Sequence, residues 1–219
     1  MQTDHLEIRR LFTERTDSYL RFIRTVGYPL ALRAFFKTWP GLRSNLRILD
    51  AGCGAGVVTL AVHDALVAHG LPIGSLDGFD LTPAMLERFR AVLTKRGITG
   101  VRLTEANVMD PHALPPDWNG YDFVVSASML EYIPREDFPK ALALLRGRLR
   151  ADGTMLLFIT RRNWLMKPLI GRWWRGNLYT ESELRAAFTE ARFSRMAFLR
   201  FAPPYWSFGV WGHIVEASQ

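Results

Sequence analysis

The feature that most constrains this chain is the stretch RILDAGCGAGVVTLAV, residues 47–62. In it, a short apolar run ends in an acid and three glycines follow at every second position. An apolar helical pattern begins directly after the third glycine. Glycine has no Cβ atom, so the backbone of this turn can adopt positive φ angles and approach a ligand closely. The helix that follows adds free N–H groups at its start. The stretch therefore predicts a strand, a ligand-binding turn and a helix, in that order.

Short apolar strands and amphipathic helices alternate along most of the remaining chain. This alternation is typical of a parallel sheet that is covered by helices on both faces. The last two strands have no helix between them and are joined by a link that contains Pro-Pro, so we expect them to pair antiparallel. The expected strands are 47–53, 76–81, 101–108, 121–128, 154–160, 194–201 and 207–217, and the expected helices are 57–69, 83–96, 138–150 and 181–191.

The fold class that follows is α/β. We predict a doubly wound, mostly parallel seven-stranded sheet with a C-terminal antiparallel hairpin and an N-terminal helical cap. Helical spacing of apolar residues between positions 4 and 38 places the cap at residues 1–40. Residues 41–219 would form the sheet domain, with a lid insertion at 161–180. A chain of 219 residues is long enough to bury one sizeable core.

Two classes of ligand use a glycine-rich turn after the first strand of such a sheet. Dinucleotide enzymes space the glycines as G-x-G-x-x-G, so that a pyrophosphate meets the start of the helix. Here the spacing is G-x-G-x-G, and Asp50 precedes the glycines. A carboxylate repels a pyrophosphate but attracts the ammonium and sulfonium groups of S-adenosylmethionine (SAM). The acid and the spacing therefore both favour SAM.

The motifs LDAGCGAG and GFDLTPAML, together with the later segment LYTESELRAAFTEARF, resemble the class I SAM-dependent methyltransferases. This family has a seven-stranded Rossmann-like fold, and the resemblance runs from about residue 47 to residue 193. It implies SAM as the cofactor, S-adenosylhomocysteine (SAH) as its product, and methyl transfer as the reaction. The Asn/Asp-Pro-Pro-Tyr-like motif that base-modifying members carry after the fourth strand is replaced here by SASMLEY. The resemblance is therefore to the small-molecule branch, and nucleic acid is not expected as a partner.

The resemblance also assigns cofactor contacts. Asp50 would hold the methionine amino group, and the backbone at Gly52 and Gly54 would run along the methionine and ribose. Asp80 would accept hydrogen bonds from both ribose hydroxyls, because a carboxylate has two acceptor oxygens. An alternative role for Asp80 is an acid that is favoured by the dipole of the helix after it, for which Thr82 is the expected N-cap.

The adenine end would be formed by residues after the second, third and fourth strands. Leu81 and Met85 would pack on the adenine face, unless they are ordinary core residues. Asn107 stands where the family usually has an acid, and its side-chain oxygen and the Val108 N–H would contact the adenine amino end. Asp110 is either a substitute acid or a turn acid before Pro111. Ser126 and Met129 would border the sulfonium.

Methyl transfer is an in-line displacement, for which alignment and exclusion of water matter most. A base is not always required, so we name only candidates for a base or an orienting group: Glu131, Tyr132, Tyr179 and His213. Glu131 could equally be a surface helix acid, and His213 a structural histidine of the last strand. One cysteine and five scattered histidines offer no ligand spacing, so no metal is expected.

The net charge of +7 is concentrated in two stretches without acids, and the second, 153–180, also carries Trp164, Trp173 and Trp174. A mixture of Arg, Lys, Trp and Leu is typical of segments at a membrane surface, which predicts peripheral membrane contact through 161–175. Alternatively, the segment is a lid whose tryptophans line a pocket. Both interpretations predict a small, apolar or amphiphilic acceptor, either a natural product or lipid-like.

Two other functional classes stay open. One is an RNA or protein methyltransferase that docks its substrate on the basic rim. The other is a non-catalytic protein with this fold. The charged first sixteen residues and the absence of an apolar run of about 18 to 20 residues predict a cytoplasmic protein without a secretory signal or membrane span. The single cysteine fits a reducing compartment. The oligomeric state is not predicted.

Overall fold

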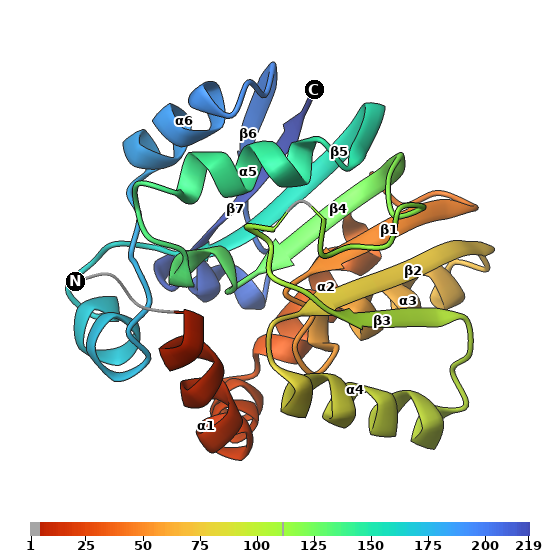
Figure 1. The fold of residues 1–219 in the computed structure, drawn as a ribbon, viewed down its shortest axis with the longest axis horizontal. Helices are drawn as coiled ribbons and strands as arrows, with labels where there is room; N and C mark the ends of the chain where they lie inside the picture. Colours follow the sequence, from red (N-terminus) through yellow and green to blue (C-terminus); the bar gives the residue numbers. More distant parts are fainter. Residues whose placement is uncertain (1–4, 111) are drawn as a thin grey trace.

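The computed structural model describes residues 5–110 and 112–219. A seven-stranded sheet with the order β3-β2-β1-β4-β5-β7-β6 forms its centre (Figure 1). Neighbouring strands are parallel up to β5, whereas β7 is antiparallel to both β5 and β6. The strands are β1 (Leu46–Ala51), β2 (Ile73–Asp80), β3 (Val101–Glu105), β4 (Tyr121–Ala127), β5 (Leu149–Thr160), β6 (Arg195–Leu199) and β7 (Gly212–Ser218). The predicted fold class and terminal hairpin are confirmed.

Helices cover both faces of the sheet. Helices α2 (Tyr28–Thr38), α3 (Val57–Ala68) and α4 (Pro83–Arg96) lie on one face, and α5 (Phe138–Arg146) and α6 (Glu181–Glu190) lie on the other (Figure 1). Each face buries its own apolar cluster against the central strands. Short helical turns complete the chain: η1 (Leu130–Tyr132), η2 (Lys167–Trp173) and η3 (Tyr205–Val210).

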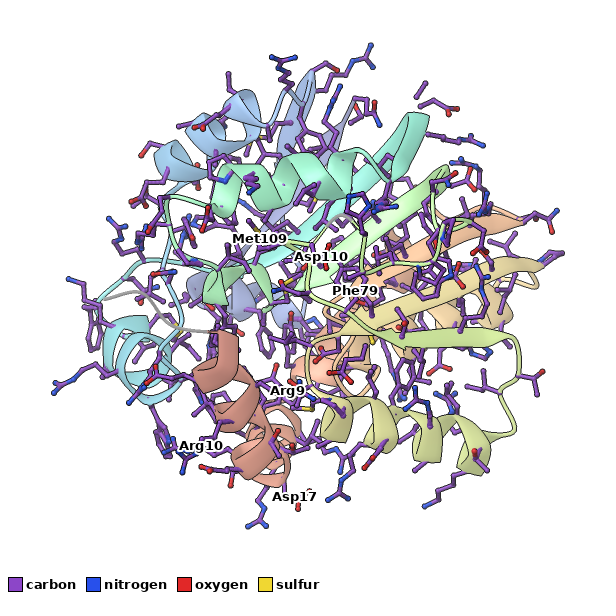
Figure 2. The ribbon with its side chains drawn as sticks, viewed as in Figure 1. Arg9, Arg10, Asp17, Phe79, Met109 and Asp110 are labelled. Atoms are coloured by element: carbon purple, nitrogen blue, oxygen red, sulfur yellow. The ribbon has the colours of Figure 1, made fainter. Side chains whose placement is uncertain are left out.

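Helix α1 (His5–Thr25) lies at the edge where the parallel strands end, beside η2 (Figure 1). Exposed ion pairs join it to β3, to α4 and to residue Arg175 beyond η2, which binds Glu7 at 3.4 Å. Arg9 binds Glu105 at the end of β3 at 2.9 Å, and Asp17 binds Arg88 of α4 at 2.8 Å. Arg9 and Asp17 are both marked in Figure 2. The predicted cap is therefore helical, but it consists of two helices, because Gly27 adopts a φ of 81° between them.

Several predicted boundaries are wrong. Residues 207–210 were expected to be strand but belong to η3, where Phe208 is buried and packs 6.0 Å from the ring of Tyr28. The helix expected over 138–150 ends at Arg146, because the chain already pairs with β4 at Leu149. In both places packing against a distant element overrides the local pattern.

Candidate active site

The glycine turn after β1 has the conformation that its sequence predicts. Gly52 and Gly54 adopt φ angles of 76° and 51°. A Cβ atom on Gly52 would lie 2.3 Å from Cβ of Met129, so glycine is needed there for close packing. A Cβ atom on Gly54 would meet no heavy atom within 4 Å. Gly54 therefore faces open space at the edge of the sheet.

Asp80, the last residue of β2, joins this turn to the start of α4. Its Oδ2 accepts a hydrogen bond from Gly54 N at 2.9 Å, and its Oδ1 accepts one from Thr82 N at 2.8 Å. Burial raises the pKa of the Asp80 carboxyl. Thr82 is the N-cap residue of α4, as expected, but its side chain makes no capping hydrogen bond. Asp80 thus serves the helix start and still offers lone pairs to a ligand.

A hollow opens beside this turn, with about 700 Å³ of empty space that includes open solvent, and we call it the glycine-turn cavity. Apolar side chains form much of its wall, and α1 contributes Tyr19. The residues predicted for the cofactor that line it are Gly52, Gly54, Asp80, Leu81, Met85, Asn107, Val108 and Met129. The structure therefore brings most of the predicted cofactor contacts to one hollow.

Asp50 and Ser126 are not on the wall of that cavity. Asp50 is buried, and its Oδ2 accepts hydrogen bonds from the backbone N–H and the hydroxyl of Thr59. Its Oδ1 has no partner among the described residues, and burial raises its pKa to about 7. Ser126 is fully buried within β4, whereas Ser128, beyond the strand end and with a φ of 55°, lines the cavity. The serine at the cavity is thus Ser128, which the sequence argument missed.

The loop after β3 differs from the expectation in detail. Asn107 lies on the cavity wall, but its Oδ1 already accepts a hydrogen bond from Met109 N at 3.0 Å. Asp110 is exposed, accepts a hydrogen bond from His112 N and is not on that wall, so it is a turn acid. Figure 2 marks Met109 and Asp110 on this loop, and Phe79 near the end of β2.

A second hollow, the aromatic cavity, has about 700 Å³ of empty space that includes open solvent, and it shares Tyr19, Ser128 and Tyr132 with the first. The segments that enclose it are far apart in the sequence: α1, η1, the end of β5, η2, η3 and the start of β7. Aromatic rings form much of its wall, among them Phe22, Tyr28, Phe158, Trp174, Phe201, Phe208 and Trp211. Local sequence patterns do not mark these rings as a group.

Glu131 lies on the wall of the aromatic cavity and is only 2% exposed. Its Oε2 accepts hydrogen bonds from the backbone N–H of Thr160 at 3.0 Å and from the Thr160 hydroxyl at 2.7 Å. Burial raises the pKa of this carboxyl to about 7. The alternative that Glu131 is a surface helix acid is therefore wrong.

Of the other candidates for a base or orienting group, Tyr132 and His213 line a cavity, whereas Tyr179 does not. Tyr132 lines both cavities. His213 lines the aromatic cavity, with its Nε2 3.2 Å from the carbonyl oxygen of Tyr179. Burial and nearby Arg161 lower the pKa of His213. Tyr179 is on neither wall, because its ring stacks on Phe138 at 4.6 Å.

The tryptophans of the predicted lid divide into two groups. Trp174 is buried on the wall of the aromatic cavity and packs edge-on against Tyr19, with ring centres 5.4 Å apart. Trp164 and Trp173 are 83% and 62% exposed. The position of Trp174 agrees with the prediction of a lid over a pocket. The exposure of Trp164 and Trp173 agrees with the alternative prediction of a segment that contacts a surface.

Comparison with known proteins agrees with this geometry. Residues 48–153 match a family model described as a methyltransferase domain. This chain carries a class I SAM-dependent methyltransferase domain. The predicted family is confirmed for this domain, and SAM is the cofactor of that family.

The methyltransferase domain has relatives among curated proteins and solved structures. It is 30% identical over 122 residues to the probable methyltransferase ltbC of Aspergillus luteorubrus, which covers 53% of this chain and 40% of that protein. The chain spans less than half the length of the curated relatives it matches. The mitomycin 7-O-methyltransferase MmcR superposes with a TM-score of 0.71 at 19% identity, covering 97% of this chain and 60% of that one. Magnesium protoporphyrin IX methyltransferase from Synechocystis PCC 6803, solved with bound SAH, superposes with a TM-score of 0.69 at 17% identity, covering 97% and 98%. These likenesses show the fold.

Proposed function

We propose that this methyltransferase domain transfers a methyl group from SAM to a small, apolar or amphiphilic acceptor. In this proposal the glycine-turn cavity holds the cofactor and the aromatic cavity holds the acceptor. The observation that carries it is the junction of the two cavities at Tyr19, Ser128 and Tyr132. A donor and an acceptor in adjoining cavities can react across such a junction, shielded from water by α1 and the lid.

The residues of the glycine-turn cavity fit SAM. Gly54 leaves open space where a side chain would otherwise project, and Asp80 retains acceptor capacity for a vicinal diol. The Oδ1 of Asp50, which precedes the turn in the sequence, is buried without a partner, and a cationic ligand on the turn would stabilise this carboxylate. Leu81 and Val108 offer apolar surface for a flat base. We assign Asp50, Gly52, Gly54, Asp80, Leu81, Asn107 and Val108 to the cofactor, and replace Ser126 with Ser128 at the junction.

When bound, SAM supplies an electrophilic methyl group on a sulfonium sulfur. The chain's own residues would orient the acceptor and take its proton. We assign proton acceptance to Glu131, through the Oε1 that its bonds to Thr160 leave available, because a base with a pKa near the working pH is most effective. Tyr132 would line the path between the cavities. His213, neutral and bonded to the Tyr179 carbonyl, would orient the acceptor.

The apolar, aromatic wall of the aromatic cavity favours a small-molecule acceptor over RNA or protein. The names of the relatives point the same way, since they include a mitomycin and a magnesium protoporphyrin methyltransferase. No helix among the described residues is long and apolar enough to cross a membrane. Peripheral membrane contact through 161–175, and a cytoplasmic location, remain predictions, and the exposed Trp164 and Trp173 support the former.

The test is transfer of labelled methyl from SAM into a cell extract that is then separated into lipid, small-molecule, RNA and protein fractions. We expect the label in the small-molecule or the lipid fraction, and the lipid fraction would support membrane contact. Label in RNA or protein would contradict the proposed acceptor class. An extract without label, together with a protein that fails to bind SAH, would support the non-catalytic alternative.

A further inference from the structure

The wall of the aromatic cavity carries a carboxylate, Glu131, but no lysine or arginine among the described residues. The protein as a whole nevertheless carries a net charge of +7. Two arginines of the lid are paired with acids: Arg161 binds Glu181 at 2.9 Å, and Arg162 binds Glu183. A ligand inside this cavity therefore contacts no lysine or arginine side chain of the described residues, and the charge of Arg161 behind His213 is shared with Glu181.

His213 does not supply a positive charge either. Burial and the adjacent Arg161 lower the pKa of its imidazole, so the ring is neutral at pH 7 and above. Bonding of its Nε2 to the Tyr179 carbonyl requires a proton on that nitrogen. The side that remains, Nδ1, is then an acceptor rather than a donor for ligands.

Glu131 is the carboxylate of this wall, and half of its bonding capacity is available. Thr160 occupies Oε2 with two hydrogen bonds, whereas Oε1 accepts none from the described residues. The lid covers this atom closely, since a Cβ atom on Gly176 would lie 3.4 Å from Oε1. The Glu131 side chain is almost fully buried, so a ligand that donates a hydrogen bond to Oε1 would form a charge-assisted bond in surroundings that contain little water.

The tyrosines around Glu131 remain protonated. Burial, and secondarily the charge of Glu131, raises the pKa of Tyr19. The pKa of Tyr28 is raised mainly by burial, with a contribution from the same carboxylate. The polar side chains of the cavity wall are thus hydroxyl groups, the His213 imidazole and the Glu131 carboxylate, set among aromatic rings.

We propose that the aromatic cavity selects a neutral, flat, aromatic acceptor whose O–H or N–H group donates a hydrogen bond to Glu131, and that it rejects carboxylates, sulfates and phosphates. Where Glu131 is ionised, as at pH 8, an anion there would face a buried like charge without a cation on the cavity wall, which is unfavourable. The aromatic walls provide most of the binding affinity, and Glu131 provides the selectivity for neutral over anionic ligands. This inference rests on the proposed function, because it takes the aromatic cavity to be the acceptor site.

The test uses three probes of similar shape with the SAH-loaded protein at pH 8: 2-naphthol, 2-naphthamide and 2-naphthoate. Isothermal titration calorimetry of the wild type should show that both neutral probes bind about tenfold or more tightly than the anion. In the Glu131→Gln variant, which keeps the shape but removes the charge, the gap between naphthamide and naphthoate should close. The Glu136→Gln variant changes an exposed acid and should keep the wild-type gap.

Equal binding of naphthamide and naphthoate by the wild type would overturn the proposal, and this comparison needs no variant to fold. If the affinity difference between naphthamide and naphthoate persisted in Glu131→Gln, the role of Glu131 would be overturned. If the wild type bound none of the three probes, the proposal would be overturned as well. Binding of SAH alone is measured first and separately. Failure at that first step would refute the proposed function, whereas normal SAH binding with unselective probes would refute only the charge rule.

Discussion

Replacing Gly54 with alanine tests the cofactor site most directly, because the structure separates its two effects. Gly54 has a φ of 51°, and its missing Cβ would lie in open space on the wall of the glycine-turn cavity. A left-handed backbone costs a non-glycine residue roughly 1–2 kcal/mol. The new methyl group clashes with nothing in the protein, so we expect the free energy of unfolding to fall by about that amount only. The added methyl instead occupies space that we assign to the cofactor.

Gly97 is the matched control. It caps the C-terminal end of α4 with a φ of 63°, and a Cβ there would also meet no atom within 4 Å, but it does not line the glycine-turn cavity. Gly97→Ala should therefore carry the same backbone cost without any effect on the ligand. Crowding by one methyl group typically costs about 1–3 kcal/mol, so SAH binding to Gly54→Ala should weaken roughly 5- to 150-fold.

Urea unfolding of the SAH-free proteins and calorimetric titration with SAH measure the two quantities independently. We expect both variants to lose similar stability and only Gly54→Ala to lose affinity. If Gly54→Ala bound SAH as tightly as Gly97→Ala does, the cofactor would not run along this turn and our reasoning would be refuted. A much larger loss of stability in Gly54→Ala than in Gly97→Ala would contradict the open space at the Cβ position.

Three further predictions concern single side chains. Asp80→Ala should weaken SAH binding by about 1–3 kcal/mol, since it leaves buried polar groups without partners. The control variant Asp110→Ala should bind SAH like the wild type. Equal affinities of the two variants in calorimetry would contradict the assignment of Asp80 to the ribose. The pKa of Glu131 is raised from 4.5 to about 7, so the folded state holds more protons than the unfolded state between those values. Stability should fall as pH rises through that window, and the fall should be smaller in Glu131→Gln when thermal melts are compared from pH 4.5 to pH 8. Trp174→Ala should lower the free energy of unfolding by about 3–5 kcal/mol, whereas Trp173→Ala should change it by less than about 0.5 kcal/mol. Trp173→Ala should instead weaken sedimentation of the protein with anionic vesicles, and unchanged sedimentation would count against membrane contact.

The part of the site that could be predicted lies in one contiguous run of sequence. The glycine spacing requires positive φ angles, and the acid at the end of β2 falls beside the turn because neighbouring parallel strands end at the same edge. For the same reason Leu81 and Val108, which follow neighbouring strands, reach the same cavity. The alternation of apolar strands with amphipathic helices also predicted the fold class.

The parts that could not be predicted depend on where the chain goes after it leaves a strand. Ser126 and Ser128 are two residues apart, but only the second lies beyond the end of β4, where a φ of 55° turns it to the cavity. Glu131 sits in a short turn that local patterns treat as surface. It is buried because the lid returns over it, with Asn177 N donating to the Glu131 carbonyl oxygen at 2.7 Å.

The sequence by itself thus determined the sheet, the glycine turn and the cofactor side of the site, since these follow from hydrophobic period and from the special backbone freedom of glycine. Only the tertiary structure decided the acceptor side. The aromatic cavity is assembled from α1, η2, η3 and β7, segments that are distant in the sequence and show no shared pattern. Its wall carries a carboxylate without a neighbouring lysine or arginine because packing buries Glu131, while Arg161 and Arg162 of the lid bind Glu181 and Glu183. These contacts join segments that are distant in the sequence, so local sequence patterns do not predict them.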